Sequence, residues 1–209
     1  MDSQEKQRLL RQLWRDRMHV EPRALELSPR AVRERTAHIW APTDIVLAEL
    51  GYLPAGALRF WLGEPRGHLI FTHRPSQYRP GPQPWRDTTL DGVCDIALAD
   101  LVDELRAAIL PVYELLDHLF GSRAGLAQPS LSAGAGATPA LAEMAERFQR
   151  IHVLGYGHDR LMAQTPSQYL AQTAWLHFHD PHELDILDPL AARWHRTLWS
   201  EAFWQRHDA

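Results

Sequence analysis

A carboxylate and an imidazole lie four residues apart in the stretch LPVYELLDHLFG, which runs from residue 110 to residue 121. Residues at this spacing project from one face of a helix, so Glu114 and His118 could share a metal ion. The same spacing equally allows the two side chains to pair with each other. A metal site also needs further ligands, and this stretch alone does not identify them.

Two other stretches contain side chains suited to proton transfer or metal binding. In GYGHDR, Tyr156 and His158 lie next to an aspartate in a glycine-rich turn, where they could act as acid and base. In HFHDPHELD, His177 and His179 would point roughly 160 degrees apart on a helix, and Asp180 is suited to capping the next helix. We interpret these stretches chiefly as a surface turn and as a helix boundary.

Nucleophilic catalysis has little support in the sequence. There is no G-x-S-x-G motif, and no glycine-rich phosphate loop follows a predicted strand. The single cysteine, Cys94, lies in a predicted buried strand and excludes an internal disulfide.

The composition is that of a globular protein. The chain has 209 residues, of which 45% are hydrophobic and 23% charged, and its formal net charge is -4. Because the basic residues are not concentrated in one patch, neither nucleic acid nor an anionic membrane is an expected partner. With no apolar run of about 18 residues, we expect a cytoplasmic protein, and the sequence leaves its oligomeric state open.

Helices and strands alternate irregularly in the first half of the chain. Residues 3–18 form a predicted amphipathic helix, and a second helix is expected to begin with Ser28 as N-cap and Pro29 at the first helical position. ALRFWL, HLIFTH and GVCDIALAD read as three short strands, whereas RPSQYRPGPQPWRD, with four prolines, reads as an exposed loop. Strands followed by helices favour an α+β fold.

The strongest periodic pattern begins at Leu98 and ends at Gly121. It predicts one long core helix with Pro111 inside it, which costs on the order of 3 kcal/mol unless the helix kinks or restarts there. Residues 121–139 are small and aperiodic and predict a flexible insert. Three helices should then begin where a capping residue precedes a proline, near Pro166, Pro181 and Pro189.

This order of elements resembles that of a known group. A strand, a long apolar helix ending in LLDHLFGS, an insert, a turn and the stretch TPSQYLAQTAWLHFHDPHELDILDPLAARWHRTLW look like the zincin metallopeptidases of the anthrax-lethal-factor and Pro-Pro endopeptidase type, and like the related Mlc-titration-factor peptidases. The likeness covers about residues 88 to 200. It implies an N-terminal helical segment at residues 1–45 and a zincin-like domain at residues 46–209, with a small mixed sheet, a long central helix and a helical C-terminal part.

The resemblance also implies where the metal site of such a peptidase would lie. The active helix of the family reads HExxHxxD, and placing its aspartate on Asp117 puts the zinc histidines at Leu110 and Glu114. The general-base glutamate of that motif then falls on Pro111. None of these three side chains can take over the role of the family residue.

The downstream helix of the family supplies a further ligand. Its ligand glutamate falls on Gln168, its supporting glutamate on Gln172, and its active-site tyrosine matches Tyr156 loosely. An amide is a far weaker zinc ligand than a carboxylate. The resemblance therefore implies a domain that holds no cofactor and catalyses nothing by the family route. Its cleft, between the helix over residues 99–120 and the helix starting at Pro166, would bind a protein or a peptide.

In an alternative interpretation, the protein is an enzyme. A metal-dependent hydrolase with a non-standard zinc site could use Glu114, His118 and His158 as ligands and Tyr156 as an acid. It is motivated by 12 histidines in the chain, several of them near the predicted cleft. A third reading is a helical scaffold that assembles through its N-terminal helix.

Overall fold

The computed structural model describes residues 3–36, 38, 40–122, 129–161, 163 and 165–207. Within these residues the protein is 64% helical, with 13 helices and one four-stranded mixed sheet. The predicted mixture of α and β structure is therefore confirmed. Part of the predicted insert, residues 123–128, lies outside the described residues.

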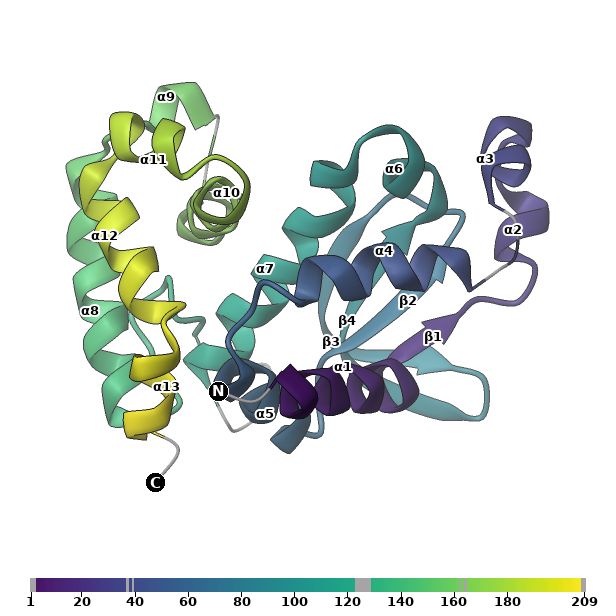
Figure 1. Ribbon diagram of the computed structural model, residues 1–209, viewed down its shortest axis with the longest axis horizontal. Coiled ribbons are helices and arrows are strands. Elements are labelled where there is room, and N and C mark those ends of the chain that lie inside the picture. The colour runs from purple at the N-terminus through teal and green to yellow at the C-terminus, as the bar shows by residue number, and fades with distance from the viewer. Residues whose placement is uncertain are drawn as a thin grey trace. The chain divides into compact units, whose positions relative to one another are not determined.

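The chain divides into two compact units, Met1–Val112 and Tyr113–Ala209. The first unit contains the whole sheet, and the second is helical (Figure 1). Helix α7 (Leu105–Gly121) begins in the first unit and ends in the second. The boundary that the resemblance implies at residue 45 is a different division of the chain and stays a prediction.

The first unit is built around the strand order β1-β2-β4-β3. Strands β1, β2 and β4 are parallel to one another, and β3 pairs antiparallel with β4 at the edge of the sheet. The strands are β1 (Met18–Val20), β2 (His68–Thr72), β3 (Gln77–Trp85) and β4 (Thr88–Ala97). The helices are α1 (Ser3–Arg17), α2 (Ala24–Leu27), α3 (Arg30–Arg35), α4 (Ala41–Leu50), α5 (Ala55–Gly63) and α6 (Leu98–Asp103).

Two strand predictions are confirmed and one is wrong. HLIFTH and GVCDIALAD contain β2 and most of β4, whereas ALRFWL lies in helix α5. A short apolar run fits either structure, because its periodicity alone does not separate them. Here Leu58 and Trp61, three residues apart, are both fully buried, which is the spacing of a helix face.

The prediction of a loop at RPSQYRPGPQPWRD is also corrected, since most of it forms β3. Pro80, Pro82 and Pro84 lack the amide hydrogen that a central strand would need. They are accommodated because β3 has a neighbour on one side only, and the pairing shifts register between Arg79 and Pro82. An edge strand tolerates residues that argue against a strand.

Helix boundaries near the N-terminus and in the long apolar segment differ from prediction in detail. The first helix ends at Arg17, and Ser28 closes α2 rather than capping the following helix, whose N-cap is Pro29. The long segment is interrupted at Glu104, between α6 and α7, and not at Pro111, through which α7 runs without a break. Gly121 ends α7, as predicted.

In the second unit the three predicted helix starts are confirmed. Each is capped by the residue that precedes the proline: Thr165 accepts from the Gln168 amide, Asp180 from that of Glu183, and Asp188 from those of Leu190 and Ala191. The helices are α8 (Pro139–Leu154), α9 (His158–Leu161), α10 (Pro166–His179), α11 (Pro181–Leu187), α12 (Pro189–Leu198) and α13 (Glu201–His207). Capping was predictable because the capping side chain and the amide that it accepts from lie only two or three residues apart in the sequence.

Three tryptophans pack in the core of the helical unit. Trp194, Trp199 and Trp204 are each less than 10% exposed, and their indole nitrogens donate to Met144 O, His195 Nδ1 and Leu198 O, respectively. Among the described helices, none taken singly is long and apolar enough to cross a membrane, although α4 and α5 together, bent by 116°, pass that test of length and composition.

Candidate functional site

The residues predicted to line a cleft are divided between the two units. Leu110 and Pro111 belong to the part of α7 in the first unit. The remaining candidates belong to the second unit: Glu114 and His118 in α7, Tyr156 in the turn after α8, His158 at the start of α9, and Gln168 and Gln172 in α10. The side chain of His158 lies outside the part of the chain that the structure describes.

Glu114 is half-buried on α7, and His118, one turn later, is 9% exposed. Burial raises the pKa of Glu114 above its usual range, and the nearby carboxylate of Asp117 raises this pKa further. Glu114 therefore keeps its proton to higher pH than an exposed glutamate does. A carboxyl group of this kind can act as an acid if a substrate reaches it.

Asp117 fastens the following segment of chain to α7. Its carboxylate is 1% exposed and accepts hydrogen bonds from the Ser132 amide at 2.7 Å and from the Ser132 hydroxyl at 2.6 Å. The hydroxyls of Ser130 and Ser167 also bond to it. Because Ser167 lies in the first turn of α10, one buried carboxylate joins three segments of the second unit. Burial outweighs these hydrogen bonds and raises the pKa of Asp117.

Gly121 has a structural role at the end of the same helix. A Cβ atom there would lie 2.4 Å from the Ser130 carbonyl carbon and 2.5 Å from the Leu131 nitrogen. The Leu131 amide also donates to the Asp117 carbonyl at 3.0 Å. The chain after residue 129 therefore passes so close to α7 that no larger residue fits at position 121 without movement. Asp117 and Gly121 both hold this close approach.

The turn GYG is fastened to the helical unit through its backbone. The Tyr156 ring is 52% exposed, but its carbonyl oxygen lies 2.8 Å from the Tyr169 hydroxyl. That hydroxyl also donates to Asp188, the N-cap of α12. Burial, and then the Asp188 carboxylate, raise the pKa of Tyr169, so the phenol stays protonated. Tyr156 is thus held in place with its ring accessible to solvent.

The histidines around the HFHDPHELD stretch are used in packing. His179 stacks on Trp175 with ring centroids 3.6 Å apart, and His177 stacks against the fully buried His195. Burial, and then Arg196, lower the pKa of His177 to about 4. Asp180 caps α11, as the sequence predicts. These side chains therefore serve the helix boundary.

A metal site is not evident in the described part of the chain. Among those residues, no three His, Cys, Asp or Glu side chains are grouped so that they could hold a metal ion. The alternative zinc site that includes His158 stays a prediction, because that side chain is not among those described.

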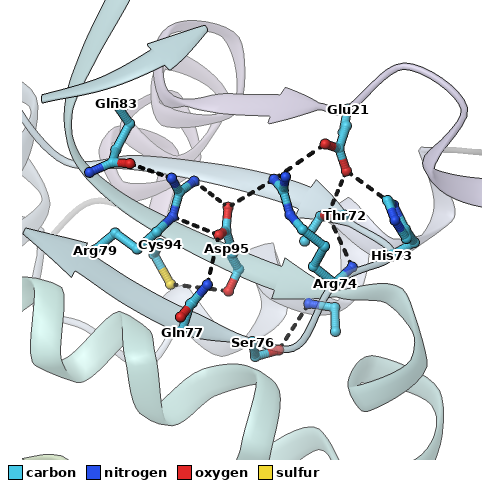
Figure 2. A network of polar contacts seen from close by, with 11 residues as sticks. Glu21, Thr72, His73, Arg74, Ser76, Gln77, Arg79, Gln83, Cys94 and Asp95 are labelled. Carbon is cyan, nitrogen blue, oxygen red and sulfur yellow. Dashed lines mark hydrogen bonds and ion pairs between the residues drawn. The ribbon is translucent and has the colours of Figure 1, made fainter.

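A polar network on the sheet of the first unit, drawn in Figure 2, was not predicted from the sequence. Its centre is Asp95 of β4, which is fully buried. Arg79 of the edge strand β3 grips both of its oxygens, with Nε 2.7 Å from Oδ2 and Nη2 2.8 Å from Oδ1. The contact from Nη2 is a hydrogen bond, and the contact from Nε is an ion pair without hydrogen-bond geometry. The signal in the sequence was a carboxylate inside the apolar strand GVCDIALAD.

The same network continues to the ends of β1 and β2. Arg74, just after β2, lies 3.9 Å from Asp95 and 3.2 Å from Glu21, which follows β1. Glu21 also accepts from the Thr72 hydroxyl at 2.5 Å and lies 3.3 Å from His73 Nδ1 (Figure 2). The network thus joins three strands and the β2–β3 turn.

The charges of this network balance. Two guanidinium groups, Arg74 and Arg79, face two carboxylates, Glu21 and Asp95, and each carboxylate has at least one cation within 4 Å. A balanced set has no excess charge to attract a ligand, and its hydrogen bonds are directed inward. We therefore assign the network to holding the edge strand on the sheet.

Comparisons of the chain with models of protein families, with curated proteins and with solved structures find no match.

Proposed function

We propose that the second unit, together with α7, is a degenerate zincin-like domain that binds a protein or a peptide and does not cleave it. One observation carries this proposal: the positions that hold the zinc ligands and the catalytic base in the family are occupied here by other residues. Leu110, Pro111 and Glu114 stand where the HExxH motif would be, and Gln168 and Gln172 stand in place of the downstream glutamates.

The chemistry of these side chains argues against the family reaction. Leucine has no lone pair to give to zinc, proline cannot take a proton from water, and an amide oxygen is a weak zinc ligand. In the family, the glutamate of the motif activates a metal-bound water. Pro111 removes that base, so restoring one histidine would not restore the reaction.

Two residues in the last two turns of α7 support the same proposal. Asp117 and Gly121 allow the chain after residue 129 to pack against α7, which is a structural role. A domain that keeps the residues of its architecture and lacks those of its chemistry fits a binding role better than a catalytic one. The helices that begin at Pro166, Pro181 and Pro189 follow the insert in the order that the sequence predicts.

The side chains at the proposed surface suit a peptide. Gln168 is exposed and Gln172 half-buried on α10, and both amides donate and accept hydrogen bonds as a peptide backbone does. The exposed Tyr156 ring adds an amphipathic contact of the kind enriched at interfaces.

A displayed library of random peptides tests this proposal. The full-length protein should enrich peptides that bind, and mass spectrometry should recover them intact after incubation with added zinc. The variant Gln172→Trp, which places a bulky side chain on the proposed surface, should lose them. The control Arg160→Glu, which changes an exposed residue of α9, should keep them. Cleaved peptides, or enrichment that is the same with Gln172→Trp, would contradict the proposal.

One observation favours the alternative of a metal-dependent hydrolase: the raised pKa of Glu114. A carboxyl group on α7 that keeps its proton to higher pH, near His118, could donate to a leaving group. This alternative requires a hydrolase activity that Glu114→Gln abolishes and that a chelator also removes. Hydrolysis unchanged by either treatment, or no hydrolysis of peptide and ester substrates, would exclude it.

A further inference from the structure

Helices α8 and α12 of the second unit lie side by side (Figure 1). Their side chains leave a groove between the two helices. Its floor is apolar, and its edges carry arginine. The residues that line it are Met144, Arg147, Arg150 and Ile151 of α8, and Leu190, Arg193, Trp194 and Thr197 of α12. On α12 they recur at the three- and four-residue spacing of one helix face, so the groove is about two helical turns, or about 10 Å, long.

The floor of the groove is well ordered by its contacts. Trp194 is 4% exposed, its indole donates to the Met144 carbonyl at 2.8 Å, and its ring packs 4.9 Å from that of Phe148. Met144 and Ile151 are buried as well. An apolar surface held in this way is already formed before a ligand arrives, which lowers the entropic cost of binding.

The rim of the groove is positively charged. Arg147, Arg150 and Arg193 line it, and none of the lining residues is acidic. The side chains of Arg147 and Arg150 are 60% and 78% exposed, and each has a glutamate one turn away at 3.7 Å or 3.6 Å. Such exposed pairs contribute little to stability, so another carboxylate can replace the glutamate at little cost.

We propose that this groove docks a short, acidic amphipathic helix of a partner protein. The apolar floor would receive one or two aliphatic side chains, and the three arginines would pair with carboxylates beside them. The groove volume of about 220 Å³ is smaller than the roughly 300–1,000 Å³ of pockets that enclose a whole small molecule. It suits the anchor residue of a helix in a groove.

Because the rim is positively charged, we expect the docking segment of the partner to be negatively charged. Arginine forms two-pronged hydrogen bonds with carboxylates and loses less entropy in doing so than lysine. A basic peptide of the same shape would be repelled by the three guanidinium groups. Complementary charge of this kind determines specificity and the rate of association more than the final affinity.

A labelled peptide tests the docking site directly. The probe is a fluorescein-labelled peptide of leucine, alanine and glutamate, about 16 residues long, with leucine at every third or fourth position. Fluorescence anisotropy with the full-length protein should show saturable binding, which weakens as salt rises. The matched peptide with lysine in place of glutamate should not bind. No binding of the acidic peptide, or equal binding of both peptides, would overturn the proposal.

Two variants of equal net charge locate the site. The double variant Arg147→Glu with Arg193→Glu should weaken binding at least about tenfold, which is about 1.4 kcal/mol. The control, Arg160→Glu with Arg206→Glu, reverses two exposed charges outside the groove and should bind as the wild type does. Thr197→Trp, at an exposed position of the rim, should block binding without altering the charge. Equal affinities of all the variants would contradict the docking site.

The remaining possible occupant is a second copy of the chain. If sedimentation shows a dimer that Arg147→Glu with Arg193→Glu dissociates, the groove is an interface between copies and the proposal is wrong. None of the described residues that line the groove belongs to α7 or α10, where the proposed peptide surface lies. Gln172→Trp should therefore leave the acidic peptide bound. Either proposal can therefore fail without the other.

Discussion

Each unit of the protein has a buried aspartate at the centre of a polar network, and the two networks are made differently. Asp95 in the sheet unit is held by guanidinium groups, chiefly that of Arg79. Asp117 in the helical unit is held by one amide and the hydroxyls of three serines. Both are 1% exposed or less. A buried aspartate therefore has charged partners in the sheet unit and neutral hydrogen-bond donors in the helical unit.

The difference has consequences for stability. A buried ion pair carries a large desolvation cost, so removing one partner leaves a charge with no compensation. A carboxylate bonded to neutral donors is instead pushed toward its protonated form, and burial does raise the pKa of Asp117. We therefore expect the sheet unit to respond more strongly to loss of a partner, and the helical unit to respond to pH through Asp117.

The largest effect is expected from Arg79→Ala. It removes the main cation of Asp95 and should lower the free energy of unfolding by about 3–5 kcal/mol, measured by urea titration followed by circular dichroism. Arg30→Ala, which removes an exposed pair with Glu34 at 2.6 Å, is the matched control and should leave the midpoint nearly unchanged. If the two variants are equally mild, the sheet unit is not fastened by charge.

Acid should also act on the sheet unit through His68. Burial first, and then Arg17 and His19, lower its pKa from 6.5 to about 4. A lowered pKa means that the stability contributed by the neutral imidazole is complete above pH 6.5 and is lost as the pH falls toward 4. The full shift corresponds to about 3 kcal/mol.

Unfolding titrations of wild type and His68→Gln at several pH values between 7 and 4 measure this effect. The wild type should lose stability over that range, and the variant should lose less. Parallel curves for the two proteins would show that His68 does not titrate in the expected window, and the charge sensitivity of the sheet unit would then lie elsewhere.

A smaller effect is expected from Asp117. Asp117→Ala leaves the Ser132 amide and hydroxyl without their acceptor and should cost about 1–3 kcal/mol. With its raised pKa, Asp117 favours the folded state most when protonated, so wild-type stability falls as the pH rises from about 3.9 through the folded pKa.

Asp117→Asn cannot ionise and separates these two effects. Relative to the wild type, it should gain stability as the pH rises across that window. If the difference between Asp117→Asn and wild type is constant with pH, the carboxylate is already charged in the folded protein and the contrast with Asp95 disappears.

The smallest effect is expected from Ser132→Ala. It deletes one of the neutral donors to Asp117 and leaves the backbone amide in place, so the loss should be about 1 kcal/mol. The midpoint temperature of thermal unfolding of Ser132→Ala should therefore lie between those of the wild type and Asp117→Ala. A loss as large as that of Asp117→Ala would mean that the hydroxyl carries most of the anchor.

Local patterns were enough to predict the caps and starts of the C-terminal helices. Asp180 and Asp188 act on amides two or three residues away, so the sequence itself contains both partners. The run around Leu58 was misread because a short apolar segment fits a strand or a helix, and β3 was missed because its prolines are acceptable only at an edge. That position depends on the whole sheet.

The anchors were not predictable for a related reason. Asp117 and Ser132 are fifteen residues apart in the sequence, and Asp95 and Arg79 are sixteen apart, with no periodic pattern that links either pair. A charged residue in an apolar strand was the one local sign that Asp95 has a specific partner. Glu114, Gln168 and Tyr156 were identified as candidates only through spacing and resemblance.

The central proposal, that the zincin-like frame has lost its metal chemistry, is tested most directly by the zinc content of the purified full-length protein. Cells grown with added zinc supply the metal, and elemental analysis after dialysis counts zinc atoms per chain. We expect zinc far below one atom per chain, in the wild type and in Glu114→Gln alike. One zinc per chain that survives dialysis, and that Glu114→Gln removes, would contradict the proposal.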